Sequence, residues 1–377
     1  MILSTVSSFP HTIEEVESLA TMGFDYICVR TGGFKKYAED KEWSAGIEAA
    51  RDLGIKVLLT WPWYSEFAFT ERDGPIISDP NYCCQAFDGR TNTASWHEGV
   101  GNHCPQFSLW NDEVEEALVA DMGCWLEEGP EVDGVHIAVS DSDRNYPTNW
   151  WAHGDKAIEG TRMFWSFDEA AQVKWDEYSG GAPMPSWSSP VITPDGEIHP
   201  ELLRFYRWYQ DGWIGRITRL ADTALDAGLK HISTWWLPHN QWTEINMANG
   251  SADSVAAISS WCQHVDDRGG TSMPMVAFQY GLAPQWPIWY ADGMETIPVA
   301  CAEPYNIRLL VGAEADVSGD ITADTIRKHG RLTAEMGASG LLCGVRLWLG
   351  TPFEAEVAEA LATIRPLFAR NANGETA

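Results

Sequence analysis

A strand–helix–strand stretch near the amino terminus decides the fold. It reads Tyr26-Ile-Cys-Val-Arg30, a helical segment over 41–53, and then Lys56-Val-Leu-Leu-Thr-Trp61. The two outer runs are short and rich in strand-forming residues, whereas the middle segment is amphipathic and is ended by Gly54. Strands that alternate with such helices are typical of parallel strands joined by crossover helices. We therefore expect a βαβ unit here.

The same alternation continues along the whole chain of 377 residues. It predicts strands at 2–9, 26–30, 56–61, 134–140, 231–236, 275–280, 307–313 and 340–348. It predicts helices at 12–22, 41–53, 112–128, 200–227, 251–265, 323–336 and 353–368. No linker rich in Pro, Gly or Ser divides these elements. The sequence therefore predicts an α/β fold, a single (β/α)8 TIM barrel that occupies residues 1–377 as one domain.

Long irregular segments follow the third, fourth, fifth and sixth predicted strands. The longest are an insertion over 64–111 and another over 141–200. In this fold, loops that follow strands lie at the carboxyl face of the barrel, where active sites are found. Loops of this length are more often functional than not.

The chain is strongly acidic, with 54 Asp and Glu against 25 Lys and Arg and a formal net charge of −29. This balance argues against a nucleic-acid partner, because phosphate neutralisation needs basic side chains. The charge suits a salty setting or a neutral or cationic substrate, although a solvated acidic surface unrelated to any partner is the simpler interpretation. No membrane segment or signal peptide is visible. We expect a cytoplasmic protein, or a secreted or periplasmic one if a signal has been removed.

Tryptophan is abundant, and its placement indicates a ligand surface. Many of the 20 tryptophans stand at predicted strand ends or in the loops that follow them. These are Trp61, Trp63, Trp150, Trp151, Trp165, Trp175, Trp187, Trp235, Trp236, Trp242, Trp286, Trp289 and Trp348. An indole offers a flat apolar face to a sugar ring and an N–H to a hydroxyl. We expect Trp61, Trp63, Trp236 and Trp348 to bind a carbohydrate.

Four further tryptophans lie inside predicted helices and have the simpler interpretation of core residues. They are Trp125, Trp208, Trp213 and Trp261.

Acidic residues follow two of the predicted strands. Glu314 follows the seventh, and Asp141 and Asp143 follow the fourth. These strands are three positions apart around the barrel, so their acids would face each other across its mouth. Glycoside hydrolysis uses such a pair of carboxyl groups, one protonated and one ionised. Asp141 and Asp143 are equal candidates for the second position.

The arrangement resembles the large clan of retaining glycoside hydrolases built on (β/α)8 barrels. That resemblance implies that Glu314 is the nucleophile and that Asp141 or Asp143 is the acid/base. It also matches the clan's Arg after strand two, Tyr after strand six and Trp after strand eight, here Arg30, Tyr280 and Trp348. Arg30 and Tyr280 would hydrogen-bond the ionised carboxylate of Glu314 and keep its pKa low. In place of the clan's Asn-Glu pair, the fourth strand reads Ser140-Asp141.

Two segments add to the resemblance. Residues 164–178, followed by His199-Pro-Glu-Leu-Leu-Arg-Phe-Tyr-Arg-Trp, are similar to beta-galactosidase-like members of the clan. Gly129-Pro-Glu-Val-Asp-Gly-Val-His is more weakly similar to the fourth strand of alpha-glucuronidase-like barrels, some of which invert. An Asp-x-Asp pair also occurs in substrate-assisted hexosaminidases. Inverting and substrate-assisted hydrolysis therefore stay open as alternatives.

Further polar residues are candidates for hydrogen bonding to the sugar. They are His239 and Asn240 in the loop after the fifth strand, and Gln279 beside Tyr280. A non-catalytic carbohydrate-binding barrel is a second alternative, because the fourth-strand motif is irregular. For the hydrolase we expect an oligo- or polysaccharide substrate, and for the non-catalytic barrel a carbohydrate ligand.

A metal-dependent sugar isomerase is the third alternative, but it would need Glu, Asp and His on several strand ends. The fifth and sixth strands end instead in aromatic and amide residues, so we expect no metal and no cofactor. Cys83, Cys84 and Cys104 share a loop with two histidines, in a spacing that matches no closed zinc pattern. A disulfide in this loop stays open.

Overall fold

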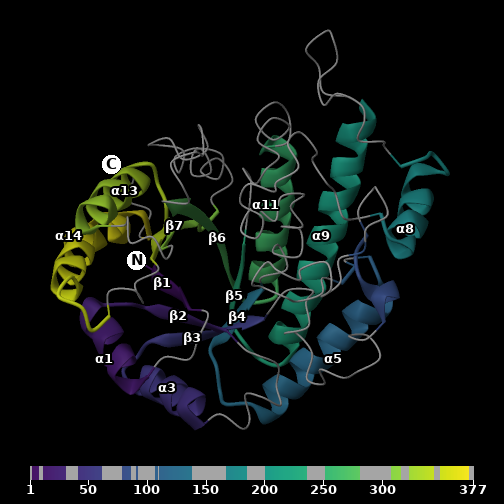
Figure 1. Ribbon diagram of the computed structural model, residues 1–377. Helices are drawn as coiled ribbons and strands as arrows, with labels where there is room; N and C mark the ends of the chain where they lie inside the picture. The colour runs from purple at the N-terminus through teal and green to yellow at the C-terminus, as the bar shows by residue number, and fades with distance from the viewer. Residues whose placement is uncertain are drawn as a thin grey trace.

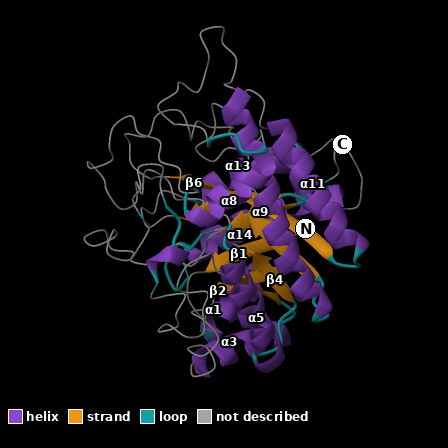
Figure 2. Cartoon of the chain, turned by 90° about the vertical axis from the view of Figure 1, so that its right-hand side faces the viewer, coloured by secondary structure: helices purple, strands orange, loops and turns teal. Residues whose placement is uncertain are grey.

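Eight parallel strands close into a barrel in the order β1-β2-β3-β4-β5-β6-β7-β8, with helices around it (Figures 1 and 2). The protein is described by a computed structural model. It describes residues 2–7, 12–30, 41–61, 79–85, 91, 107–108, 110–137, 167–184, 200–235, 251–280, 307–315, 322–343 and 349–372. The predicted α/β barrel is confirmed by this topology.

The strands are short. Their bounds are β1 Ile2–Ser7, β2 Tyr26–Arg30, β3 Lys56–Trp61, β4 Gly134–Ile137, β5 His231–Trp235, β6 Thr271–Tyr280, β7 Leu310–Ala315 and β8 Gly340–Cys343. The helices are α1 Ile13–Met22, α3 Lys41–Asp52, α5 Asp112–Glu128, α8 Glu169–Ser179, α9 Pro200–Asp226, α11 Ser251–Asp267, α13 Ala323–Glu335 and α14 Glu354–Ala372, with a 3₁₀ turn η2 at Pro80–Tyr82.

The register of the strands gives the barrel its stagger. Each strand pairs residue by residue with the next, for example Tyr26 with Lys56 and Leu58 with Gly134. A row of paired residues, followed from strand to strand, does not close on itself. Following all eight ladders once around returns to the starting strand eight residues away. This is the shear of an α/β barrel, in which the strands tilt and the interior is filled by layers of side chains.

Local sequence explains where several helices begin and end. Thr12 caps α1: its side chain accepts a hydrogen bond from the Glu15 amide, and the Glu15 side chain accepts one from the Thr12 amide. The helix ends at Gly23, whose φ of 83° is a left-handed conformation that favours glycine. Asn111 caps α5 in the same manner, accepting from the amides of Glu113 and Val114. α5 begins at the predicted residue 112, and α1 begins at Ile13, one residue after the predicted start.

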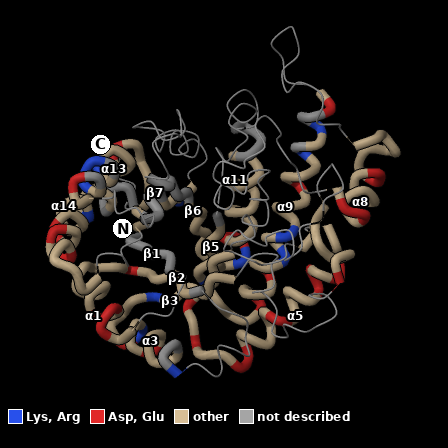
Figure 3. Tube along the Cα trace, viewed as in Figure 1, with Lys and Arg blue, Asp and Glu red and all other residues tan. Residues whose placement is uncertain are grey.

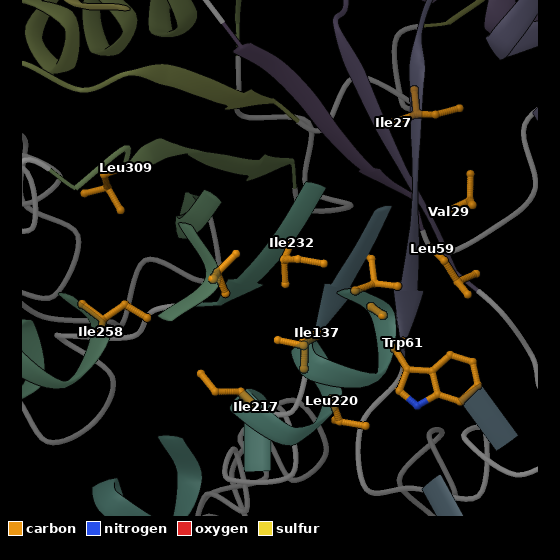
Figure 4. Close-up of a cluster of buried hydrophobic side chains, with 14 of the residues drawn as sticks. Ile27, Val29, Leu59, Trp61, Ile137, Ile217, Leu220, Ile232, Ile258 and Leu309 are labelled. Atoms are coloured by element: carbon orange, nitrogen blue, oxygen red, sulfur yellow. The ribbon is translucent and has the colours of Figure 1, made fainter. Parts of the chain in front are cut away.

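The main hydrophobic core lies between the outer face of the barrel and the helices. Figure 4 shows strand residues such as Val29, Leu59 and Ile137 packed with helix residues such as Leu220 and Ile258. All five are nearly or fully buried. Alternate residues of β2, β3, β4 and β8 contribute to this layer, because successive side chains in a strand point to opposite faces.

The structure differs from the sequence-based expectation at two strands. β6 begins at Thr271 and runs through Pro274, whereas the predicted strand begins after that proline. β7 runs from Leu310 to Ala315, so Glu314 stands inside the strand and not after it. A strand's ends are set by the length of its neighbours' ladders, which local propensity does not reveal.

Helix α8 was not predicted, since its residues fall within the insertion over 141–200. Asp168 caps it and Gly180 ends it. Its low content of regularly spaced apolar residues explains why periodicity does not reveal it.

Asp and Glu positions are spread along the helices that surround the barrel, as the red segments of the trace in Figure 3 show. In the part of the chain that the structure describes, no helix is long and apolar enough to cross a membrane.

Candidate functional site

The interior of the barrel is lined by every second residue of each strand. At its amino-terminal end the side chains of Tyr26, Lys56 and His231, from β2, β3 and β5, contact one another, which is possible only if all three point inward. The ladders pair residues that share a face, so the inward positions can be followed along every strand.

Continuing this alternation toward the carboxyl ends reaches the predicted site. Arg30 is four residues along β2 from Tyr26 and stands at an inward position, paired with Thr60. Glu314 is four residues along β7 from Leu310 and is paired with Gln279 of β6. Arg30, Gln279 and Glu314 therefore occupy the inward set at the end of their strands.

These three positions also lie at one height. The barrel has a stagger of eight residues over eight strands. Positions at the same height along the barrel axis are therefore offset, from one strand to the next, by about one residue from the positions that the ladder pairs. With that correction, Arg30 and Gln279 lie within about one residue of the level of Glu314. Residues that are 284 positions apart in the chain thus meet at the same rim, with β8 and β1 between Arg30 and Glu314.

The ladder distinguishes the two candidates at the end of β6. Glu314 pairs with Gln279, whereas Tyr280 pairs with Ala315 and stands at the alternate position. In the ladder, Gln279 and not Tyr280 is therefore the register partner of Glu314. The roles of both stay predictions.

Trp61 lies in the hydrophobic core and not at the surface of the mouth. Its side chain is 1% exposed, and it stands at an outward position with Leu59 and Ile137 (Figure 4). Its indole nitrogen makes no hydrogen bond to the described residues. The reason is its place in the register: the inward neighbour at this height is Thr60, whose side chain is also buried.

Several predicted site residues lie outside the described residues. They are Asp141, Asp143, Trp63, Trp236, His239, Asn240 and Trp348. Their assignments stay predictions.

Polar side chains continue below the rim. His136 of β4 and Ser233 of β5 are fully buried at paired inward positions, with 2.7 Å between Nδ1 and Oγ. Burial lowers the pKa of His136 to about 3, so its imidazole is neutral at physiological pH.

A buried cluster of tryptophans lies outside the barrel, between α8 and α9, and was not predicted. Trp175 of α8 was expected at the rim, but it is 2% exposed and packs edge-on against Trp208 of α9. Its indole N–H donates to the carbonyl of Ala182 at 2.7 Å. Trp110 stacks on the other side of the cluster, with its ring centre 3.9 Å from that of Trp208. Trp175 therefore has a packing role, because helix α8, which was not predicted, positions it against α9.

The four helical tryptophans are buried as expected. Trp125, Trp208, Trp213 and Trp261 are all 9% exposed or less.

Two cysteines of the insertion after β3 lie in the protein interior. Cys83 and Cys84 are buried and carry thiols, and burial raises the pKa of Cys83 to about 12. Cys124 of α5 is exposed. Among the described residues no three His, Cys, Asp or Glu side chains gather in a way that could hold a metal ion.

Comparison with solved structures finds barrels of distant sequence. A GH18 chitinase from Pseudoalteromonas aurantia aligns with a TM-score of 0.46 and 10% identity, over 96% of this chain and 99% of the other. Phospho-2-dehydro-3-deoxyheptonate aldolase (DAHP synthase) from Thermotoga maritima aligns with a TM-score of 0.38 and 9% identity, over 99% of this chain and 70% of the other. Likeness at this level carries no argument about activity.

No protein-family model and no curated protein matches the sequence. The fold therefore rests on the strand topology, and the resemblance to the retaining clan stays a prediction.

Proposed function

We propose that this barrel is a glycoside hydrolase that cleaves O-glycosidic bonds of an oligo- or polysaccharide with retention of configuration. Glu314 is the nucleophile, and Asp141 or Asp143 is the acid/base. Arg30 and Gln279 hold the nucleophile in its ionised form.

The register of β7 is the observation that supports the proposal most. It puts Glu314 at an inward position at the rim, beside Gln279 and level with Arg30. A guanidinium and an amide donor favour the charged form of a carboxyl group and lower its pKa. A nucleophilic carboxylate needs that environment.

The chemistry uses two steps. In the first, the carboxylate of Glu314 forms a bond to the anomeric carbon while the glycosidic C–O bond breaks, and the aspartic acid gives its proton to the leaving oxygen. In the second, the same aspartate removes a proton from water, and the resulting hydroxyl displaces Glu314 from the sugar. Retention requires carboxyl groups about 5–5.5 Å apart, which allows direct attack without an intervening water.

The substrate class follows from aromatic content and loop length. Trp63, Trp236 and Trp348 supply stacking surfaces, and His239 and Asn240 supply polar contacts. The two long insertions suit a substrate of several sugar units. The acidic chain favours a neutral or cationic sugar over a highly sulfated one.

Substitution of the acids tests the proposal. Glu314→Gln is expected to lower turnover by at least about a thousandfold, because an amide cannot attack the anomeric carbon. One of Asp141→Asn and Asp143→Asn should have an effect of similar size. The measurement is hydrolysis of a panel of neutral, uronic and amino-sugar glycans, with Glu335→Gln, an exposed residue at the end of α13, as the matched control.

Two results would count against the assignment. Unchanged turnover in Glu314→Gln removes Glu314 as nucleophile. Glycan binding by the wild type without hydrolysis of any glycan supports the non-catalytic alternative. The anomer first released, read by NMR, separates retention from inversion.

A further inference from the structure

The two insertions of the active face are joined at one buried carboxyl group. The hydroxyl of Ser108, in the insertion after β3, donates to Oδ1 of Asp168, in the insertion after β4, at 2.6 Å. Asp168 also caps α8 by accepting from the amide of Ala171 at 3.0 Å. Two backbone bonds run alongside, from Phe167 to Gln85 and from Ser108 to Tyr82. The Asp168 side chain thus joins Ser108 to the start of α8, and the two backbone hydrogen bonds attach residues 79–85 to both.

The joined segments stand against α9. We call them the side wall: residues 79–85, 107–108, 110 and 167–184. Figure 1 shows α8 beside the part of α9 that extends past the barrel. With 27 residues α9 is about 40 Å long, so only its later part covers β4 and β5. The side wall packs on its earlier part through Trp110 and Trp175.

The surroundings of Asp168 are poor in charge. Its side chain is 5% exposed, and Oδ2 makes no hydrogen bond to the described residues. Burial raises the pKa of Asp168 to about 6, while hydrogen bonds from Ser108 and backbone amides act in the opposite direction. The protonated carboxyl group keeps both acceptor bonds and removes a buried charge.

Other titratable groups of the adjoining elements have their own partners. Cys83 and Asp79 come from the segment before Ser108, and Cys83 interacts with Asp168. Tyr82 bonds Glu113 of α5. Lys174 of α8 pairs with Asp112 of α5, and Arg204 of α9 bonds the carbonyl of Ser179. No cation among these is shown to neutralise Asp168.

We propose that Asp168 is a pH-dependent latch that holds the two insertions together when protonated and loosens the side wall when ionised. In an opened wall the carboxyl group meets water and returns to its ordinary pKa of 3.8. The closed wall therefore binds the proton more tightly, so closure is favoured fully at pH below 4. The advantage is lost as pH rises to about 6, and the open fraction grows by up to about a hundredfold.

In the sequence, Asp168 belongs to the same insertion as Asp141 and Asp143, the candidates for the acid/base. The latch does not depend on the proposed hydrolysis, since it concerns only contacts within the wall.

Hydrogen exchange read by mass spectrometry tests the latch between pH 4 and 7.5. After correction for chemical exchange, protection of peptides covering 107–110 and 167–175 should fall with rising pH by up to about a hundredfold. Peptides of α13 should change little. In Asp168→Asn, which keeps an acceptor oxygen but cannot ionise, the fall should vanish. Asp176→Asn, an exposed acid of the same helix, should behave as the wild type.

A fall of equal size in Asp168→Asn, or none in the wild type, overturns the latch. If Asp168→Asn does not fold, Ser108→Ala takes its place. This change removes a donor that lowers the pKa of Asp168, so the fall must extend to higher pH, and an unchanged profile overturns the latch. Loss of any glycosidase activity plays no part in these outcomes, so the two proposals fail separately.

Discussion

Three polar side chains meet inside the amino-terminal end of the barrel and show how single residues set each other's charge. The ammonium of Lys56 donates to Nε2 of His231 at 2.9 Å, since a lysine can only donate. Nδ1 of the neutral ring then donates to the hydroxyl of Tyr26 at 3.3 Å. Burial first, and then the charge of Lys56, lower the pKa of His231. Burial and nearby aspartates raise the pKa of Tyr26 to about 12.

Removing the ammonium should move the titration of His231. In Lys56→Met we expect the pKa of His231 to rise, because the repulsion of a second cation is lost. Lys230→Met should raise it less, since Lys230 is a weaker cause of the shift. NMR titration of the His231 ring measures both, with exposed Lys41→Met as control. A pKa unchanged in Lys56→Met contradicts the proposed coupling.

The same shift has a consequence for stability. A histidine with a lowered folded pKa contributes stability that is complete above its unfolded value of 6.5 and is lost as pH falls. His136 acts in the same direction down to about pH 3. Asp168 acts oppositely, since its raised pKa costs stability as pH rises from about 4 to 6.

At the scale of elements, the attachment of the side wall to α9 depends on a missing side chain. The indole of Trp110 lies on the surface of α9 at Gly212, where an added Cβ would overlap the ring. Gly215, three residues on, has open space at the same point. The two glycines therefore share a helix but differ in what faces them.

Alanine substitutions at these two sites should have opposite effects. Gly215→Ala is expected to raise the free energy of unfolding by about 0.5–1 kcal/mol, the difference in helix propensity. Gly212→Ala gains the same propensity but displaces Trp110, so we expect a net loss of about 1–3 kcal/mol. Urea denaturation followed by tryptophan fluorescence measures both. Equal stabilisation by the two changes would show that Trp110 does not pack as described.

At the scale of the whole molecule, the net charge is the main electrostatic influence on the stability of the fold. A formal charge of −29 on 377 residues means that folding brings many like charges closer together than they are in the unfolded chain. Their repulsion destabilises the compact state and is screened by salt.

Salt should therefore stabilise the fold. Between about 0.05 and 1 M sodium chloride, where the Debye length falls to about 3 Å, we expect Tm to rise by at least about 5 °C. Differential scanning calorimetry measures this, with trehalose at matched osmolality as an uncharged control. A Tm that is flat or falls with salt, or rises equally with trehalose, contradicts an electrostatic cause.

Much of the fold is predictable from local patterns. Strand β3 and helix α5 begin and end at the predicted residues, because apolar spacing, Asn111 and Gly54 are local signals. The identity of Glu314 as a candidate also comes from its place near a strand end. α8 escapes prediction because its stability comes from packing Trp175 on α9, a contact between distant segments.

The sequence by itself determines the number and order of the barrel strands and of the helices that alternate with them, because their apolar spacing is a local signal, whereas α8 depends on a contact between distant segments. Only the tertiary structure decides which residue of each pair faces the interior. A shift of one residue exchanges the two faces of a strand, and the stagger of the closed barrel settles the choice. That is why Gln279 is paired with Glu314 in place of Tyr280, and why Trp61 lies in the core while Thr60 takes the inward position.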